Sequence, residues 1–141
     1  LEKDFIDEQP DVVSILRGVN DCWHFADSRD FRDISVFEQN FRNILTALKE
    51  KTKAKIMLIE PFLLPVPDKA FWRCKIDKEI VTVRALAKEF DCVLCPMDGL
   101  LAGEYCSDDI YSFSADGVHP LEKQAEIMGR FYAEYFEKLG V

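Results

Sequence analysis

The chain has 141 residues, of which 48% are hydrophobic and 31% charged, the composition of a folded domain of ordinary size rather than of a disordered segment. Its 26 acidic and 18 basic residues give a net charge of −8, and such a surface repels nucleic acid and anionic lipid headgroups. No apolar run reaches the roughly 20 residues of a membrane-spanning helix, so we expect neither nucleic acid nor a transmembrane segment.

The first two predicted elements are a strand and a long amphipathic helix. Residues 11–17 (DVVSILR) form a short run rich in β-formers. Apolar residues at helical spacing predict a helix over residues 34–51. We expect Asp33 or Ser35 to cap this helix, with Glu38, three residues after Ser35, completing a capping box.

The middle of the chain predicts a strand, a helix and a further strand. Residues 55–60 (KIMLIE) have the pattern of a buried strand. The segment 61–67 (PFLLPVP) cannot continue it, because proline removes backbone donors and restricts the residue before it. Apolar residues along one side predict a helix over residues 75–90, and residues 91–96 (DCVLCP) predict the third strand.

The last third of the chain predicts a helical turn over residues 99–105, a polar loop over 106–115 and a final helix. This helix is expected to begin just after Pro120, which suits a first helical position, and to end near residue 139. Strands that alternate with helices of this length predict an α/β fold, in which helices cover both faces of a parallel sheet.

Three strands are few for such a sheet. The strand at residues 11–17 would lie at an edge, and an exposed apolar edge favours association. We therefore expect a single domain over residues 1–141 that is truncated at its N-terminus, lacks N-terminal strands and self-associates through the exposed sheet edge.

Five cysteines without a regular framework indicate free thiols in a reducing compartment, which predicts a cytoplasmic location. Cys92 and Cys95 have CxxC spacing, but positions i and i+3 of a strand face opposite ways. Neither a second such pair nor a histidine lies nearby in the sequence. We interpret both as core thiols, and we expect no metal and no other cofactor.

The segment Asp116-Gly117-Val118-His119-Pro120 places a carboxylate three positions before an imidazole. A serine hydroxyl becomes a good nucleophile when a base accepts its proton and an acid holds that base in one tautomer. Asp116 can reach His119 if Gly117 permits the turn, and Pro120 favours an extended backbone at His119. In the alternative interpretation, Asp116 caps the final helix and His119 is an ordinary loop residue.

A second segment, Gly18-Val19-Asn20-Asp21, follows the first predicted strand. Ligands of open parallel sheets bind beyond the carboxyl ends of the strands, and we expect the His119 loop at the same rim. The amide of Asn20 can donate to an oxyanion, and Gly18 lets the turn pass close to substrate. The alternative is a plain turn rich in turn-forming residues, and Asp21 is interpreted as a turn or cap residue.

These two segments resemble the G-x-N-D and D-G-x-H-P blocks of the SGNH hydrolases, also called GDSL-type esterases and lipases. The resemblance extends over essentially all 141 residues. It implies a flavodoxin-like three-layer fold and the hydrolysis of small acyl esters through a serine acyl-enzyme. It also implies that His119 is the base, Asp116 its orienting partner, and Asn20 with Gly18 the oxyanion hole.

The sequence departs from this family in one respect, because the G-D-S block that carries the nucleophile is not found in it, nor is the following block with a further oxyanion glycine. No serine stands in a strand-turn-helix setting that would expose it beside His119; the serines are Ser14, Ser28, Ser35, Ser107, Ser112 and Ser114. Cys22 follows the oxyanion segment, but we interpret it as a small apolar filler rather than a nucleophile. We therefore expect an esterase portion that is inactive alone. The alternatives are a non-catalytic α/β binding or assembly module and an α/β signalling domain.

Large apolar residues in the predicted loops have two interpretations. They either line an acyl pocket or fold back as a lid over the core; they are Trp23, Phe62, Leu63, Leu64 and Trp72. Arg17, which ends an otherwise apolar strand, either reaches the rim or pairs with an acidic residue.

Overall fold

A three-stranded parallel sheet forms the centre of the protein, whose computed structural model describes residues 6–26 and 28–141. Strand β1 spans Val12–Leu16, β2 spans Lys55–Ile59 and β3 spans Val93–Cys95. The strands lie in the order β1-β2-β3, and the register of the first pair runs from Val12 opposite Lys55 to Leu16 opposite Ile59. All three predicted strands are thus confirmed, each shortened by one to three residues.

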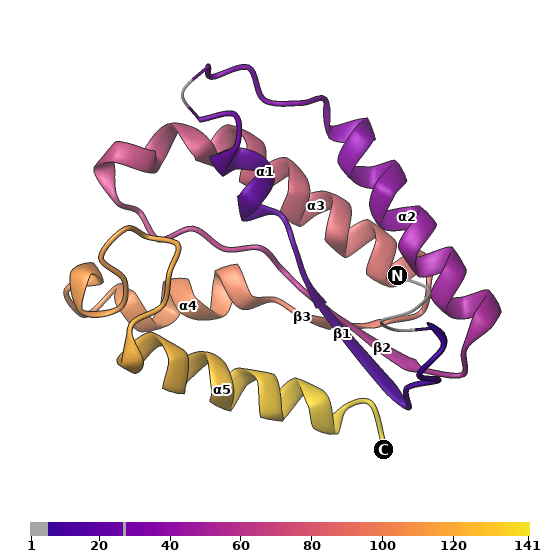
Figure 1. Ribbon diagram of the computed structural model, residues 1–141. Helices are drawn as coiled ribbons and strands as arrows, with labels where there is room; N and C mark the ends of the chain where they lie inside the picture. Colours follow the sequence, from indigo (N-terminus) through magenta and orange to yellow (C-terminus); the bar gives the residue numbers. More distant parts are fainter. Residues whose placement is uncertain (1–5, 27) are drawn as a thin grey trace.

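Helices cover both faces of this sheet, as Figure 1 shows. Helices α2 (Ile34–Lys51) and α3 (Arg73–Glu89) lie on one face, and α4 (Met97–Tyr105) and α5 (Glu122–Glu137) lie on the other. Side chains of β2 alternate between the two layers, because successive residues of a strand point to opposite faces. Ile56 and Leu58 pack towards α2 and α3, whereas Met57 and Ile59 pack towards α4 and α5. The expected three-layer α/β architecture is confirmed.

Three short helices lie outside the predicted pattern. Helix α1 (Val19–Trp23) follows β1, the 3-10 helix η2 (Pro67–Trp72) precedes α3, and η3 (Ile110–Ser112) lies in the predicted polar loop. Segments of three to six residues are too short to show a hydrophobic period. Helices α1, η2 and α3 share an apolar cluster around Leu63 and Trp72, which lies beyond the carboxyl end of the sheet.

The predicted capping box of α2 is wrong, although the helix has the predicted bounds. Asp33 is the N-cap, and its carboxylate accepts a hydrogen bond from the backbone N–H of Ser35 at 2.8 Å. The helix therefore begins at Ile34, and Glu38 lies two residues beyond the position from which a side chain reaches back to the cap. Glu38 instead accepts a hydrogen bond from Arg42 at 3.0 Å.

Helix α5 begins later than predicted. Its N-cap is Leu121, whose backbone is extended and whose N–H donates to the carbonyl of Phe113 at 2.8 Å. This bond keeps the chain out of the helix until Glu122. Pro120 consequently remains in the loop that carries His119, rather than at the first helical position.

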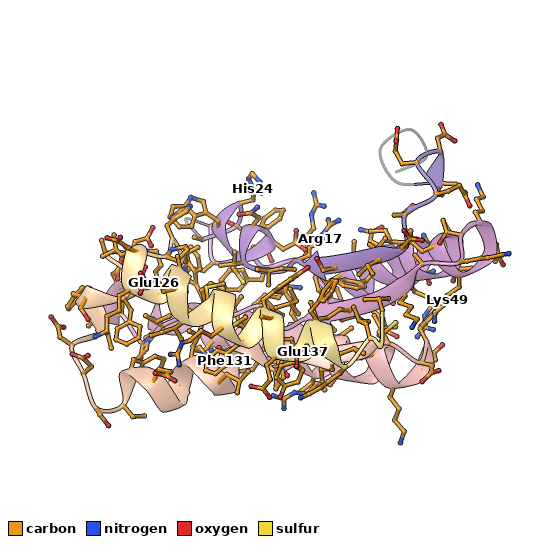
Figure 2. All side chains as sticks on the ribbon, turned by 90° about the horizontal axis from the view of Figure 1, so that it is seen from below. Arg17, His24, Lys49, Glu126, Phe131 and Glu137 are labelled. Carbon is orange, nitrogen blue, oxygen red and sulfur yellow. The ribbon has the colours of Figure 1, made fainter. Side chains whose placement is uncertain are left out.

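Strand β1 is an edge strand in the part of the chain that the structure describes, because its only partner there is β2. Figure 2 shows β1 along the border of the molecule, with Arg17 at its end pointing away from the sheet. Leu16 is 47% exposed on this border. A hollow of about 300 Å³ lies beside the strand, between it and Ile44 and Leu48 of α2. The predicted exposed edge is therefore present.

The cysteines form no disulfide. Cys95 is buried and Cys92 half-buried, and burial raises the pKa of both thiols, to about 11 for Cys95. Within residues 6–26 and 28–141, no helix is long and apolar enough to cross a bilayer.

Candidate active site

Asp116 holds His119 through both its ring and its backbone. The Nδ1 atom of His119 lies 2.7 Å from Oδ2 of Asp116, and the backbone N–H groups of Val118 and His119 donate to Oδ1 at 2.9 and 2.8 Å. In the neutral imidazole this arrangement puts the proton on Nδ1 and leaves Nε2 as the acceptor. Asp116 does not cap α5, whose N-cap is Leu121. The turn therefore prepares the imidazole to act as a base.

The carboxyl group of Asp116 stays ionised in this turn. Partial burial by itself raises its pKa, but the hydrogen bonds from the His119 ring, from the two backbone N–H groups and from Ser114 outweigh that effect. Together they hold the pKa of Asp116 well below its usual range. A negative charge on Asp116 thus faces Nδ1 of His119.

Gly117 gives the turn its shape. Its φ of +79° lies in the left-handed region, which favours glycine. A Cβ atom at this position would lie 2.6 Å from Cγ2 of Val66, and the Gly117 carbonyl accepts a hydrogen bond from the Leu64 N–H at 3.0 Å. Gly117 therefore permits the turn, as expected, and also docks it on the buried segment 61–66.

Gly18 packs tightly against Pro61 and against Glu79 of α3. Its φ is +149°, and a Cβ atom there would lie 2.7 Å from both Oε2 of Glu79 and Cβ of Pro61. Gly18 is the N-cap of α1, and its carbonyl accepts a hydrogen bond from the N–H of Asp21 at 2.8 Å. Asn20 follows in the first turn and is exposed. No side chain or backbone group of the described residues binds its amide, which leaves the N–H groups free to donate.

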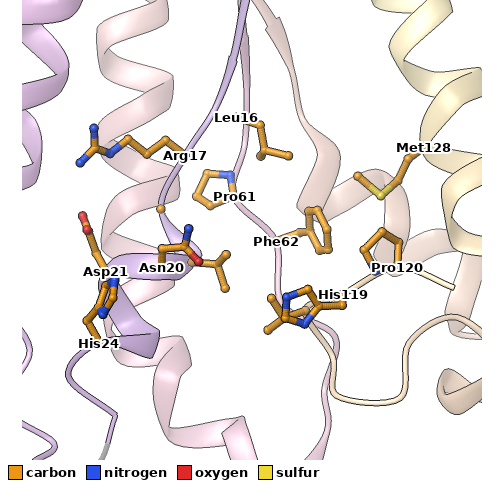
Figure 3. A pocket seen from close by; sticks show the side chains of 13 residues that line it. Leu16, Arg17, Asn20, Asp21, His24, Pro61, Phe62, His119, Pro120 and Met128 are labelled. Carbon is orange, nitrogen blue, oxygen red and sulfur yellow. The ribbon is translucent and has the colours of Figure 1, made fainter.

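A cavity of about 710 Å³ at the carboxyl end of the sheet brings the two segments together. Gly18 and Asn20 form one wall, and Val118 and His119 form another. Figure 3 shows Asn20 and His119 on opposite sides of this cavity, with Pro61 above Asn20 and Phe62 above His119 in this view. The structure thus places all the predicted oxyanion and base residues around one space, with Asp116 behind the imidazole.

Three further polar residues of the β1–α1 region line this cavity, namely Arg17, Asp21 and His24. Arg17 reaches the rim of the cavity, which was the first of the two interpretations drawn from the sequence. His24 was missed by the sequence reasoning. It follows Asn20 by four residues, so one turn of helix puts both side chains on one face. That signal becomes visible only once the short helix α1 is known.

Most of the expected pocket residues belong to the core instead. Of the five large apolar loop residues considered from the sequence, only Phe62 lines the cavity, whereas Leu63, Leu64 and Trp72 are buried. Trp23 packs edge-on against the His119 ring, with centroids 5.5 Å apart, and against Trp72 at 5.3 Å. These contacts support the interpretation that the loop aromatics cover the core, and they fix one side of the imidazole.

No lining residue of this cavity, among the residues that the structure describes, carries a hydroxyl or thiol group. Ser114 is fully buried behind the turn, where its hydroxyl lies 2.8 Å from the His119 carbonyl and 3.2 Å from Oδ1 of Asp116. Ser14 accepts a hydrogen bond from Tyr132 at 3.2 Å. Neither of these two serines lines the cavity that His119 faces.

Cys22 is also unsuited to nucleophilic attack. It is fully buried in the cluster around Leu63, and burial, followed by the nearby Glu79 carboxyl, raises its thiol pKa to about 12. Cys22 packs as an apolar filler, as interpreted from the sequence. Within the described residues, no group of three or more His, Cys, Asp or Glu side chains could hold a metal ion.

The chain is similar to several known proteins. A model of the GDSL-like lipase/acylhydrolase family matches residues 1–127. A Parabacteroides merdae protein assigned as a GDSL-like lipase is 30% identical, with a TM-score of 0.87 over 95% of this chain and 63% of that one. None of the curated proteins compared with the chain matches it.

Two more distant structures share the fold. The acetylxylan esterase Axe2 from Geobacillus stearothermophilus is 23% identical, with a TM-score of 0.85 over 99% of this chain and 64% of that one. LAE5, an α/β hydrolase from the metagenome of Lake Arreo, is 18% identical, with a TM-score of 0.84 over 98% of this chain and 65% of that one. The chain thus spans less than two thirds of the length of each of these proteins.

The turn geometry predicts opposite effects for two glycines. Gly117→Ala should lower the free energy of unfolding by about 1–3 kcal/mol, because the left-handed backbone and the contact with Val66 both oppose a Cβ atom. In the control, Gly129→Ala in α5, the added Cβ atom has no neighbour within 4 Å. This variant should raise the free energy of unfolding by up to about 1 kcal/mol. Urea unfolding of both variants measures this, and equal changes would contradict the described turn.

The Asp116–His119 hydrogen bond predicts the tautomer of the imidazole. In the unaltered chain the neutral His119 ring should carry its proton on Nδ1, and Asp116→Ala should remove this preference because the acceptor is lost. Ring ¹⁵N chemical shifts report the tautomer directly. His24, which makes no such bond with Asp116, is the internal control and should not change. An unaltered His119 spectrum in the variant would rule out the orienting role.

Proposed function

Because the chain belongs to the GDSL-like lipase/acylhydrolase family, we propose that it carries out part of the hydrolysis of small carboxylic esters. In this proposal His119 is the general base, Asp116 orients it, and Asn20 beside Gly18 donates to the oxyanion. The observation that carries the proposal is the single cavity that an oriented imidazole and an unpartnered amide both face.

The proposed reaction begins when a serine hydroxyl attacks the ester carbonyl and Nε2 of His119 takes up its proton. The carbonyl oxygen becomes an oxyanion, which receives a hydrogen bond from the Asn20 amide; one such donor contributes roughly 3–4 kcal/mol to transition-state stabilisation. His119 then returns the proton to the departing alcohol. Water hydrolyses the acyl-enzyme by the same steps, which regenerates the serine.

We further propose that this serine comes from polypeptide beyond the 141 residues. The cavity has no hydroxyl of its own among the described residues. Axe2 has been solved with catalytic substitutions of a serine and of a histidine by alanine, which supports the pairing of these two residue types in the fold. Axe2 is named as an acetylxylan esterase, but only the ester class is extended to this chain.

A second candidate function is a non-catalytic binding or assembly module with the same scaffold. The absence of a hydroxyl or thiol from the lining of the described cavity favours it. The two candidates differ in what a serine-bearing segment would do: it creates an esterase in the first and has no chemical effect in the second.

We also propose that the chain self-associates through the free edge of β1 and resides in a reducing compartment, the cytoplasm. The second edge of β1, which has no strand partner among the described residues, supports the first proposal because its backbone groups can accept another strand. The unpaired cysteines support the second.

The missing nucleophile predicts that the 141-residue chain hydrolyses short acyl esters at background rates and is not labelled by a fluorophosphonate. Joining it to the upstream coding sequence of its gene should give both labelling and turnover, and His119→Ala should then lower kcat by at least about 10³-fold. The matched control is His24→Gln, which removes the other histidine without touching Asp116. Strong labelling of the 141-residue chain, or full activity of His119→Ala, would contradict the proposal.

The exposed edge predicts concentration-dependent association in light scattering. Leu16→Lys should weaken it, because charge on an edge strand opposes pairing with another chain. Val81→Lys is the control, since Val81 is an exposed apolar residue of α3 rather than of the edge. A monodisperse monomer across a wide concentration range would count against the proposed association.

A further inference from the structure

A buried carboxyl group lies directly beneath the turn that carries Asn20. Glu79 of α3 has no exposed surface, and neither of its carboxyl oxygens has a hydrogen-bond partner among the described residues. Its Oε2 atom would lie 2.7 Å from a Cβ atom at Gly18. The side chain thus occupies the space that the glycine leaves open, one residue before α1 begins.

The charged neighbours of Glu79 compensate it only in part. Lys75, one turn earlier on α3, has its Nζ atom 3.6 Å from Oε1 of Glu79, but it donates to the carbonyl of Arg32 at 2.9 Å. Asp21 of α1 adds a repulsive charge, Arg17 at the end of β1 adds a weak attractive one, and the Cys22 thiol lies close by. Burial therefore dominates over attraction at this position.

Glu79 consequently titrates in a range unusual for a carboxyl group. Burial is the largest cause, Lys75 opposes it and Asp21 adds to it, and together they raise the pKa of Glu79 from 4.5 to about 8. Between these values the unfolded chain binds fewer protons than the folded one, so this group lowers stability as pH rises from about 4.5 to about 8. The group under Gly18 is therefore harder to ionise than an exposed carboxyl group.

Glu60, a second buried carboxyl group of this protein, has a different ionic partner from Glu79. Glu60 is equally inaccessible, but Arg84 donates to its Oε1 atom at 2.6 Å. Glu60 thus has a guanidinium partner that Glu79 lacks. Ionisation of Glu79 would leave a buried carboxylate whose ion-pair partner, Lys75, lies 3.6 Å away, and such a charge is costly to keep in place. Gly18, one residue before α1, lies against this side chain.

We propose that Glu79 is a positioning residue for Asn20: its neutral carboxyl group supports the Gly18 turn in the conformation described here, and its ionisation displaces that turn and the amide it carries. The inference rests on the role proposed above for Asn20 as the oxyanion donor. In this proposal, the position of the Asn20 amide depends on whether the buried carboxyl group of Glu79 is protonated.

The test is an NMR titration of the isotope-labelled 141-residue chain from about pH 6 to about pH 10. The backbone amide of Gly18, the side-chain amide of Asn20 and the carboxyl carbon of Glu79 should titrate together with a midpoint near 8. Glu79→Gln keeps the shape of the side chain and cannot ionise. In this variant the chemical shifts of both amides should not change with pH and should match those of the unaltered chain at low pH. Lys75→Met should move the midpoint upward, because an opposing positive charge is removed.

His24→Gln is the matched control, because it removes the imidazole that lines the cavity at the end of α1 and should leave the midpoint near 8. Amide signals of Gly18 and Asn20 that do not follow the Glu79 carboxyl carbon would overturn the proposal. So would a pH-dependent Asn20 signal that persists in Glu79→Gln. The titration needs no ester hydrolysis, so an inactive esterase would leave its outcome intact, and a failed titration would leave the proposed hydrolysis intact.

Discussion

The site depends on one constraint, namely that both of its halves are anchored to the same buried segment. Residues 61–66 leave the sheet after β2 and run beneath the cavity, mostly buried. Pro61 fills the space beside Gly18, while Leu64 and Val66 hold Gly117 through a hydrogen bond and a side-chain contact. Two segments about a hundred residues apart in sequence are thereby held in contact with residues 61–66. The imidazole and the amide face one cavity because of this shared contact.

Residues 61–66 form no strand pairing with any of the described residues, and a side chain binds one of their backbone N–H groups. Asp98 at the start of α4 accepts a hydrogen bond from the N–H of Leu63 at 3.3 Å and pairs with Arg73 of α3 through both carboxylate oxygens, at 2.8 and 3.0 Å. Helices on the two faces of the sheet are therefore joined across the segment. Such fixed support holds the side chains around the cavity in one geometry.

Sequence reasoning predicted most of the fold and the main residues of the site, for identifiable reasons. Helix α2 was predicted to the residue because its apolar stripe runs through five turns, and the Asp116–His119 pair is local enough to be read from spacing. Helix α1 was missed because five residues show no period, and His24 was missed with it. Glu79 was overlooked because Lys75 and Glu79 at positions i and i+4 have the pattern of an exposed ion pair. Their burial follows from the tertiary contact of α1 with α3, which no local pattern contains.

Anchoring both halves to one template also limits how this scaffold can diversify. An insertion or deletion within residues 61–66 would shift one half relative to the other, so its length cannot vary freely. The connections at residues 28–33 and 106–109 are largely exposed and bear no such requirement. Changes of length are therefore better tolerated at these two connections than within residues 61–66, and the floor of the cavity stays fixed.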